Sequence, residues 1–230
     1  MHLLIPAAGV GKRMGSDRNK LLLPLLHHSI LAWTLLAAEA APTITWIGIM
    51  GQPLDFPDFE GILHGLELTT PVQLIQGGDT RQQSVFNGLE ALPPEAQTVL
   101  IHDGARCLVT PELFDRCSQA MDECQGMVVA VPVKDTIKVV NQELVITNTP
   151  DRAYLYAAQT PQGFDVALLK QCHHRGVTEA WEVTDDAALF ERCNLPVNIV
   201  QGEETNLKIT TPVDLAIAEF ILKQRQSISP

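Results

Sequence analysis

Short apolar runs alternate with segments of helical character along most of this 230-residue chain. Continuous apolar runs predict buried strands over residues 3–5, 45–50, 72–75, 98–102 and 127–133. Helix caps and apolar spacing predict helices over residues 30–41, 80–92, 111–124, 165–175, 184–193 and 212–224. This alternation is typical of a mostly parallel sheet covered on both faces, so we expect an α/β three-layer sandwich. The pattern contains no linker or repeat, and we expect one domain over residues 1–230.

One segment departs from this alternation. Residues 136–140 and 144–148 are rich in β-branched side chains and are separated by Asn141-Gln142-Glu143, a pattern that predicts a hairpin. An isolated hairpin is marginally stable, so this arm (about residues 134–152) must pack either on its own domain or on another subunit.

Composition disfavours several kinds of partner. The 27 acidic residues outnumber the 16 Lys and Arg, and a net charge of −11 disfavours binding to nucleic acid or to an anionic membrane. The five cysteines are odd in number and form no Cys-x-x-Cys pair, which favours reduced thiols in a cytoplasmic protein and argues against structural zinc. Apolar runs are too short for a membrane span and the start has no basic leader, so we expect neither a membrane segment nor a signal peptide.

A loop rich in glycine and cations follows the first predicted strand. It reads PAAGVGKRMG over residues 6–15, with Lys20 a few residues later. Glycine lets the backbone approach a ligand closely, and fixed positive charge suits a polyphosphate. Arg13 stands where a Walker A loop needs a hydroxyl, and Met14 where a dinucleotide fingerprint needs a small residue. Taken alone, the loop fits either a solvated turn or a nucleotide site. Its place at the carboxyl end of a strand favours the nucleotide site.

Other polar groups also follow predicted strands. Asp103-Gly104-Ala105-Arg106 could bind a hydroxyl or Mg²⁺ and a phosphate, or could form a simple turn. Gly77-Gly78-Asp79-Thr80-Arg81 with Ser84 could read a base edge, or could cap the next helix through Asp79 or Thr80.

The remaining candidates are weaker. Lys208, on a predicted strand or strand end, either points into a site or extends to solvent. His173 and His174 are expected on the surface, and Ser84 and Cys107 have no base in triad order, so we expect no nucleophilic catalysis.

Together these motifs resemble the 2-C-methyl-D-erythritol 4-phosphate cytidylyltransferases. The matching segments run in order over nearly the whole chain: 7–14 with Lys20, 77–79 with Ser84, 102–106, 151–152, 160–164, 183–186 and 207–210. The resemblance implies a Rossmann-like nucleotidyltransferase domain whose hairpin arm embraces a second subunit in a homodimer.

The resemblance also implies a reaction and its residues. A substrate phosphate oxygen attacks the α-phosphorus of CTP in the presence of Mg²⁺, pyrophosphate leaves, and 4-diphosphocytidyl-2-C-methyl-D-erythritol is formed for non-mevalonate isoprenoid synthesis. The implied catalytic residues are Arg13, Lys20, Arg152 and Lys208. The implied CTP site comprises Pro6, Ala7, Ala8, Gly9, Gly11, Gly78, Asp79, Ser84 and Gly104. The implied polyol-binding residues are Asp103, Arg106, Thr136 and Thr184, and Asp103 is the candidate metal ligand.

The chain departs from the family pattern in two loops. Gly104 and Cys107 stand where Ala and Pro are usual, and Leu21-Leu22 where Gln and an aromatic residue are common. Three alternatives stay open: a ribitol-5-phosphate cytidylyltransferase of the same fold, a non-catalytic nucleotide sensor, and an NAD-dependent oxidoreductase. Met14 and the lack of an acid after the second strand disfavour the oxidoreductase.

Overall fold

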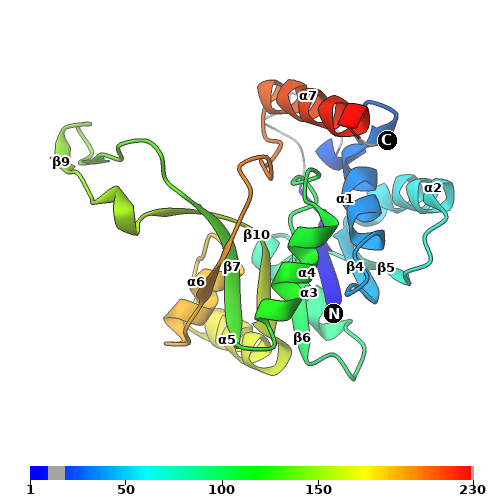
Figure 1. The fold of residues 1–230 in the computed structure, drawn as a ribbon. Helices are drawn as coiled ribbons and strands as arrows, with labels where there is room; N and C mark the ends of the chain where they lie inside the picture. Colours follow the sequence, from blue (N-terminus) through cyan, green and yellow to red (C-terminus); the bar gives the residue numbers. More distant parts are fainter. Residues whose placement is uncertain (10–18, 229–230) are drawn as a thin grey trace.

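The computed structural model describes residues 1–9 and 19–228, and its centre is a seven-stranded mixed sheet (Figure 1). The strands are β1 (His2–Pro6), β4 (Trp46–Gly51), β5 (Val72–Gln76), β6 (Thr98–Ile101), β7 (Gly126–Pro132), β10 (Tyr156–Asp165) and β11 (Asn198–Gln201). Their spatial order is β11-β7-β10-β6-β1-β4-β5. All neighbours pair in parallel except β10, which is antiparallel to both β6 and β7. The predicted α/β fold with a mostly parallel sheet is confirmed.

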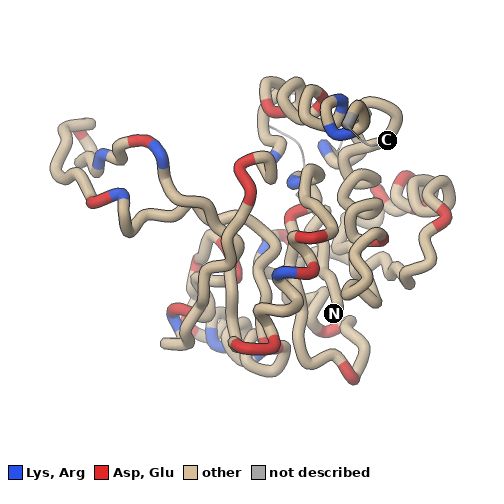
Figure 2. Tube along the Cα trace, viewed as in Figure 1, with Lys and Arg blue, Asp and Glu red and all other residues tan. Residues whose placement is uncertain are grey.

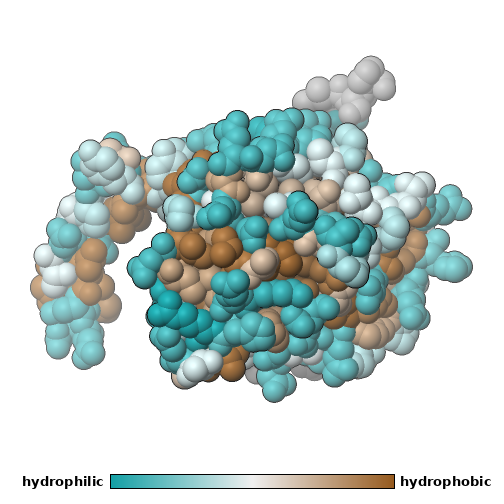
Figure 3. All heavy atoms as spheres, turned by 90° about the horizontal axis from the view of Figure 1, so that it is seen from below, coloured by the Kyte–Doolittle hydropathy of each residue, from teal (hydrophilic) through white to brown (hydrophobic). Residues whose placement is uncertain are grey.

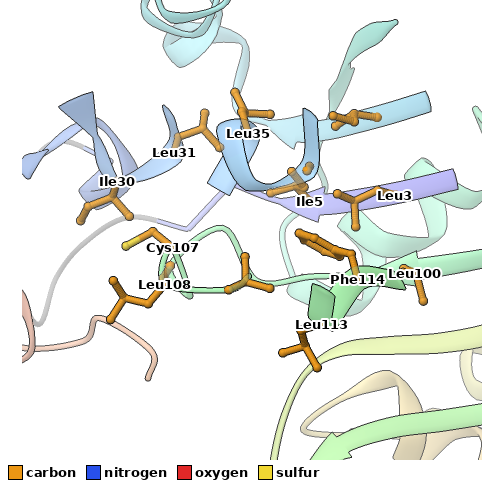
Figure 4. Close-up of a cluster of buried hydrophobic side chains, with 14 of the residues drawn as sticks. Leu3, Ile5, Ile30, Leu31, Leu35, Leu100, Cys107, Leu108, Leu113 and Phe114 are labelled. Carbon is orange, nitrogen blue, oxygen red and sulfur yellow. The ribbon is translucent and has the colours of Figure 1, made fainter. Parts of the chain in front are cut away.

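Helices cover both faces of the sheet. One face carries α1 (Ile30–Glu39), α2 (Phe56–Leu66), α4 (Pro111–Ala120) and α7 (Pro212–Ile228). The other face carries α3 (Arg81–Glu90), α5 (Val166–Thr178) and α6 (Asp186–Arg192). Successive side chains of β1 alternate between the two cores, with Leu3 and Ile5 in the first and Leu4 in the second. Figure 4 shows Leu3 and Ile5 between α1 and Phe114 of α4.

Helix starts follow the capping residues in the sequence. The side chain of Ser29 accepts a hydrogen bond from the N–H of Ala32 and begins α1, as predicted. Thr80, one of the two predicted alternatives, caps α3 by accepting from the N–H of Gln83. α4 ends at Ala120, four residues before the predicted end.

Among the strands of the central sheet and the helices that cover it, the sequence pattern missed α2, β10 and β11. β10 lies between β6 and β7, yet its central residues Gln159, Thr160 and Gln162 are polar and it contains Pro161. A strand without an apolar run gives no periodic signal, and proline inside a run argues against a strand. The polar side chains are nevertheless buried, because hydrogen bonds to residues from other elements satisfy them.

The predicted hairpin is present and projects from the body of the molecule (Figure 1). Its strands, β8 (Val139–Val140) and β9 (Ile146–Asn148), are shorter than predicted and pair antiparallel. The arm carries both signs of charge (Figure 2) and exposed apolar side chains (Figure 3), including Leu144 at 81% exposure.

The remaining short elements lie at the ends of loops. They are the two-stranded hairpin of β2 (Pro24–Leu25) with β3 (His28–Ser29), and the 3₁₀ turns η2 (Lys20–Leu22), η3 (Pro53–Asp55) and η4 (Arg152–Tyr154). Within residues 1–9 and 19–228, no helix is both long and apolar enough to cross a bilayer.

Candidate active site

A cavity of about 350 Å³ opens where β1, β5 and β6 end. Segments that are far apart in the sequence meet there, as expected for the carboxyl edge of an open α/β sheet. The predicted site residues that line it are Pro6, Ala7, Ala8, Gly9, Lys20, Gly78, Asp79, Ser84, Asp103, Gly104 and Lys208. Five further lining residues had been given no role of their own: Leu21, Thr80, Arg81, Ala105 and Thr210. Arg13 and Gly11 lie outside the described residues.

The loop after β1 is anchored on both sides of the gap in the described chain. The N–H of Ala7 donates to the carbonyl of Met50 at 2.7 Å, which continues the pairing of β1 with β4. The buried amide of Asn19 donates to the carbonyl of Ala7 at 2.6 Å and to Asp55 at 2.8 Å. Nζ of Lys20 donates to the carbonyl of Ile209 at 2.8 Å, so this cation is held against the segment that carries Lys208.

The Gly77-Gly78 turn forms the second wall. A Cβ on Gly77 would lie 2.7 Å from Cβ of Ala8, so a larger residue would collide with the first loop. Oγ of Ser84 accepts from the N–H of Gly78 at 3.0 Å and donates to the carbonyl of Thr80 at 2.9 Å. Ser84 is therefore a brace that fixes the turn, and Asp79 is presented at the cavity wall.

Asp103 lies between two cations at the floor of the cavity. Nζ of Lys208 lies 2.5 Å from Oδ2 of Asp103, and Nε of Arg81 lies 3.4 Å from Oδ1. Burial by itself would raise the pKa of Asp103, but the charges of Arg81 and Lys208 outweigh burial and hold the pKa of this carboxyl well below its usual range. The floor therefore presents a fixed carboxylate and two fixed cations. Lys208 was predicted on a strand or a strand end, which is wrong: residues 202–211 form loops and turns.

Arg81 extends this charge network behind the cavity. Its Nη1 donates to Oδ2 of Asp186 at 2.7 Å, and Asp186 is 1% exposed. Burial favours a neutral Asp186, yet the charge of Arg81 keeps the pKa of this carboxyl below its usual value. A cation in the first turn of a helix is disfavoured by the helix dipole, so an arginine directly after the Thr80 cap was a sequence signal for a nearby carboxylate.

His173 is buried and not on the surface, so that prediction is wrong. Its ring lies on α5 at 1% exposure, with Nε2 3.6 Å from Oδ1 of Asp186, a separation longer than a hydrogen bond. The prediction placed both His173 and His174 on the surface. Consecutive residues on a helix face different directions, and in α5 His173 faces α6 while His174 is exposed.

His102 fixes the backbone at the end of β6. The hydroxyl of Thr160 accepts from the N–H of Asp103 at 3.0 Å, so its proton is free to go to Nδ1 of His102 at 3.1 Å. Nε2 then carries the ring proton and donates to the carbonyl of Arg106 at 3.2 Å. Complete burial lowers the pKa of His102 to about 4, so the ring is neutral near pH 7.

Four predicted residues do not line the cavity. The guanidinium of Arg106 donates to the carbonyls of Asn206 at 2.8 Å and Ala158 at 3.3 Å, so it ties the loop after β6 to strand β10 and to the loop that carries Asn206. Thr184 is exposed just before α6. Thr136 and Arg152 are exposed on the arm, where Arg152 donates to the carbonyl of Lys134 at 2.8 Å.

Asp103 does not fit the role of a metal ligand in this arrangement. Both of its oxygens face cations, and the described residues contain no group of three His, Cys, Asp or Glu side chains placed to hold a metal ion. Mg²⁺ commonly uses few protein ligands and takes the rest from substrate phosphates and water.

Two departures from the family pattern prove to be in contact. A Cβ on Gly104 would lie 2.9 Å from Cδ1 of Leu21 and 3.1 Å from Cγ2 of Ile5. The leucine and the glycine are therefore complementary in size, and the loop keeps its close approach to β1. Cys107 is buried in the core, and burial raises the pKa of its thiol to about 12.

Comparison with known proteins agrees with this geometry. Residues 1–224 match the family model IspD, described as 2-C-methyl-D-erythritol 4-phosphate cytidylyltransferase. Proteins with that description are 69% identical to the chain over 225 residues in Nostoc punctiforme (98% of this chain, 99% of the relative) and 69% identical over 229 residues in Synechocystis sp. (100% of each).

A solved structure has the same fold as this chain. The crystal structure of 4-diphosphocytidyl-2C-methyl-D-erythritol synthase from Anaerococcus prevotii superimposes with a TM-score of 0.87 at 31% identity, covering 96% of this chain and 97% of that one. Family match, sequence identity and fold therefore coincide over nearly the full length, and the chain belongs to the 2-C-methyl-D-erythritol 4-phosphate cytidylyltransferase family, a family of nucleotidyltransferase enzymes.

Proposed function

We propose that the cavity binds CTP and 2-C-methyl-D-erythritol 4-phosphate and transfers the cytidylyl group between them. Pyrophosphate leaves, and 4-diphosphocytidyl-2-C-methyl-D-erythritol is formed for non-mevalonate isoprenoid synthesis. The observation that carries the proposal is the meeting of Lys20 and Lys208 in one cavity, in a chain of this family. Two lysines from opposite ends of the sequence are held there by contacts to Ile209 and Asp103.

The proposed chemistry needs charge stabilisation more than proton transfer. The second pKa of a phosphate monoester is about 6, so the attacking oxygen is already an anion near neutral pH. Charge develops on the phosphoryl oxygens and on the leaving pyrophosphate, and fixed cations stabilise it best. This fits a site whose one buried histidine near the floor, His102, is engaged with the backbone and with Thr160.

We assign roles to the lining residues from the family resemblance, and their places in the cavity support the assignment. The walls formed by Ala7, Ala8, Gly78, Asp79 and Ser84 would hold cytosine and ribose, with Pro6, Gly9 and Gly104 at the same loops. Lys20, together with Arg13 of the loop outside the described residues, would hold the triphosphate. Lys208 and Asp103 would hold the polyol phosphate. Mg²⁺ would enter bound to the CTP phosphates.

The arm supports a homodimer with composite sites. Its apolar side chains Ile137, Val139, Leu144 and Ile146 are between 39% and 81% exposed, which is unfavourable unless a partner covers them. Thr136 and Arg152 lie at the two ends of the arm and away from the cavity of their own chain. We therefore assign them to the polyol phosphate bound by the neighbouring subunit. Thr184 and Arg106 stay assigned to the polyol side, where substrate binding would have to bring them closer.

Pyrophosphate release over a grid of nucleotides and polyol phosphates tests the proposal. The expected result is Mg²⁺-dependent release that is fastest with CTP and 2-C-methyl-D-erythritol 4-phosphate. Faster turnover with ribitol 5-phosphate would support the other cytidylyltransferase, and tight CTP binding without release would support a nucleotide sensor. The five free thiols are consistent with a cytoplasmic enzyme, and the two cores on one sheet with a single domain.

A further inference from the structure

Arg81 is held between two carboxylates from distant parts of the chain. Its Nη1 lies 2.7 Å from Oδ2 of Asp186, while its Nε lies 3.4 Å from Oδ1 of Asp103. The other oxygen of Asp103 faces Lys208 at 2.5 Å. The four groups thus form a chain of alternating charge that begins at a buried residue and ends at the cavity.

The buried end of this chain is rigidly placed. The side chain of Asp185 caps α6 by accepting from the N–H of Ala188 at 3.0 Å, and it also accepts from Nε2 of Gln162 at 2.9 Å. Oε1 of Gln162 in turn accepts from the N–H of Ala187 at 3.2 Å. Asp186 lies between these anchored residues, so the first turn of α6 is fixed to β10 on both sides of it.

The shorter bond identifies Asp186 as the anchor of Arg81. A charge-assisted hydrogen bond weakens as it lengthens, so Arg81 is bound more tightly to Asp186 than to Asp103. An arginine shared in this way touches one oxygen of Asp103 and leaves the second oxygen for Lys208. If Asp186 were neutral, the fork of Arg81 would be able to take both oxygens of Asp103 and displace Lys208.

We propose that Arg81, anchored by Asp186, is a positioning residue that fixes the Asp103 carboxylate and through it Lys208 for the polyol phosphate. This rests on the proposed assignment of Asp103 and Lys208 to that substrate. Neither Arg81 nor Asp186 needs to touch the reacting atoms. Their effect is on the affinity and orientation of one substrate, and the nucleotide walls braced by Ser84 are left as they are.

Steady-state kinetics with each substrate varied separately test this role. Asp186→Asn and Arg81→Gln should each raise the KM for the polyol phosphate about 10-fold, while the KM for CTP changes less than about 2-fold. The reason is that each variant loses the charged hydrogen bond between Arg81 and Asp186, which holds Asp103 and Lys208 in place for the polyol phosphate. Arg81→Lys keeps the charge, but one ammonium cannot bridge both carboxylates, so the polyol KM should stay raised. Because the two residues act as a unit, the double variant Arg81→Gln/Asp186→Asn should be no worse than Arg81→Gln.

The matched control is another ion pair made by α3. Lys170 on α5 contacts Glu90 on α3 at 3.1 Å on the surface, and Lys170→Ala should leave both KM values unchanged. A lower thermal midpoint in the test variants with both KM values unchanged would overturn the proposal, because the network would then serve the fold alone. An equal rise in the KM for CTP would also overturn it, since Arg81 would then act on the nucleotide.

Two further variants separate this inference from the proposed function. Asp103→Asn and Lys208→Met should raise the polyol KM. If these two variants raise the polyol KM and the Arg81 and Asp186 variants leave it unchanged, the positioning role is wrong and the assignment of the polyol phosphate still holds. If Asp103→Asn and Lys208→Met leave the polyol KM unchanged, the assignment of the polyol phosphate is wrong and the positioning role falls with it. Should Asp186→Asn fail to fold, Arg81→Gln and Arg81→Lys decide the question, because the Arg81 side chain is 30% exposed at the cavity.

Discussion

The floor of the cavity and the hairpin arm both carry predicted catalytic cations, but they hold them in opposite ways. Lys208 and Arg81 are paired with buried carboxylates, and Lys20 is held by a backbone carbonyl. Arg152 lies on an exposed arm, where it donates to a backbone carbonyl of that arm beside uncovered apolar side chains. The floor is preorganised within one chain, whereas the cation of the arm lies outside that cavity and is held by its own arm. The cavity is lined by one chain, and the proposal is that the arm of a second chain completes it.

The most severe test of the preorganised floor is removal of Lys20. Lys20→Ala should raise the activation barrier by about 4 kcal/mol and so lower kcat on the order of a thousandfold. The reason is that a fixed cation stabilises charge that grows in the transition state. The KM for CTP should change far less. Single-turnover and steady-state pyrophosphate release would separate the two effects, with Lys170→Ala as a surface control. Near-normal kcat with a raised KM for CTP would show that Lys20 binds the ground state.

The buried floor should also make stability depend on pH through His102. Its pKa in the folded protein is lowered to about 4, whereas an unfolded histidine takes up a proton near pH 6.5. The contribution of His102 to the free energy of unfolding is therefore fully present above pH 6.5. It is lost as the pH falls toward 4, by up to about 3 kcal/mol. Urea unfolding of the wild type and of His102→Gln at pH 7.5, 6 and 4.5 would measure it. Parallel pH curves for the two proteins would show that another group is responsible.

Mixing two impaired variants tests whether the arm completes the neighbouring site. Arg152→Ala should raise the activation barrier by about 2 kcal/mol, because the polyol phosphate loses one charged contact. A heterodimer of Lys20→Ala with Arg152→Ala would then hold one site lacking both residues and one site with both intact. Activity should recover on mixing. Absence of recovery, with subunit exchange confirmed by mass spectrometry, would place Arg152 in the site of its own chain.

The apolar face of the arm gives the smallest expected effect. Leu144→Asp should weaken dimerisation by about 1–2 kcal/mol, roughly tenfold in Kd, because an exposed leucine gains its burial energy only at the interface. Sedimentation across a concentration series would measure the shift. Leu54→Asp is the matched control, because Leu54 is 80% exposed but lies outside the arm. Equal shifts for both variants would argue against the arm as the interface.

Much of the fold was predictable because its signals are local. Apolar runs located β1, β4, β5, β6 and β7, and Ser29 and Thr80 marked helix starts. β10 escaped because its buried Gln159 and Gln162 are satisfied by partners more than twenty residues away, which no local pattern reveals.

The candidate site also has features that the sequence predicts and features that depend on tertiary contacts. The sequence by itself determined which loops carry cations and glycines, and the order of strands then implied that they meet at one edge, because ligand sites in open α/β sheets form at the carboxyl ends of strands. Only the tertiary structure decided which side chains face the cavity. It brought in Arg81 through Asp186, turned Arg106 toward backbone carbonyls, and buried His173. Pairing between charges is decided by distances of a few ångströms between distant segments, and the sequence does not contain those distances until the chain has folded.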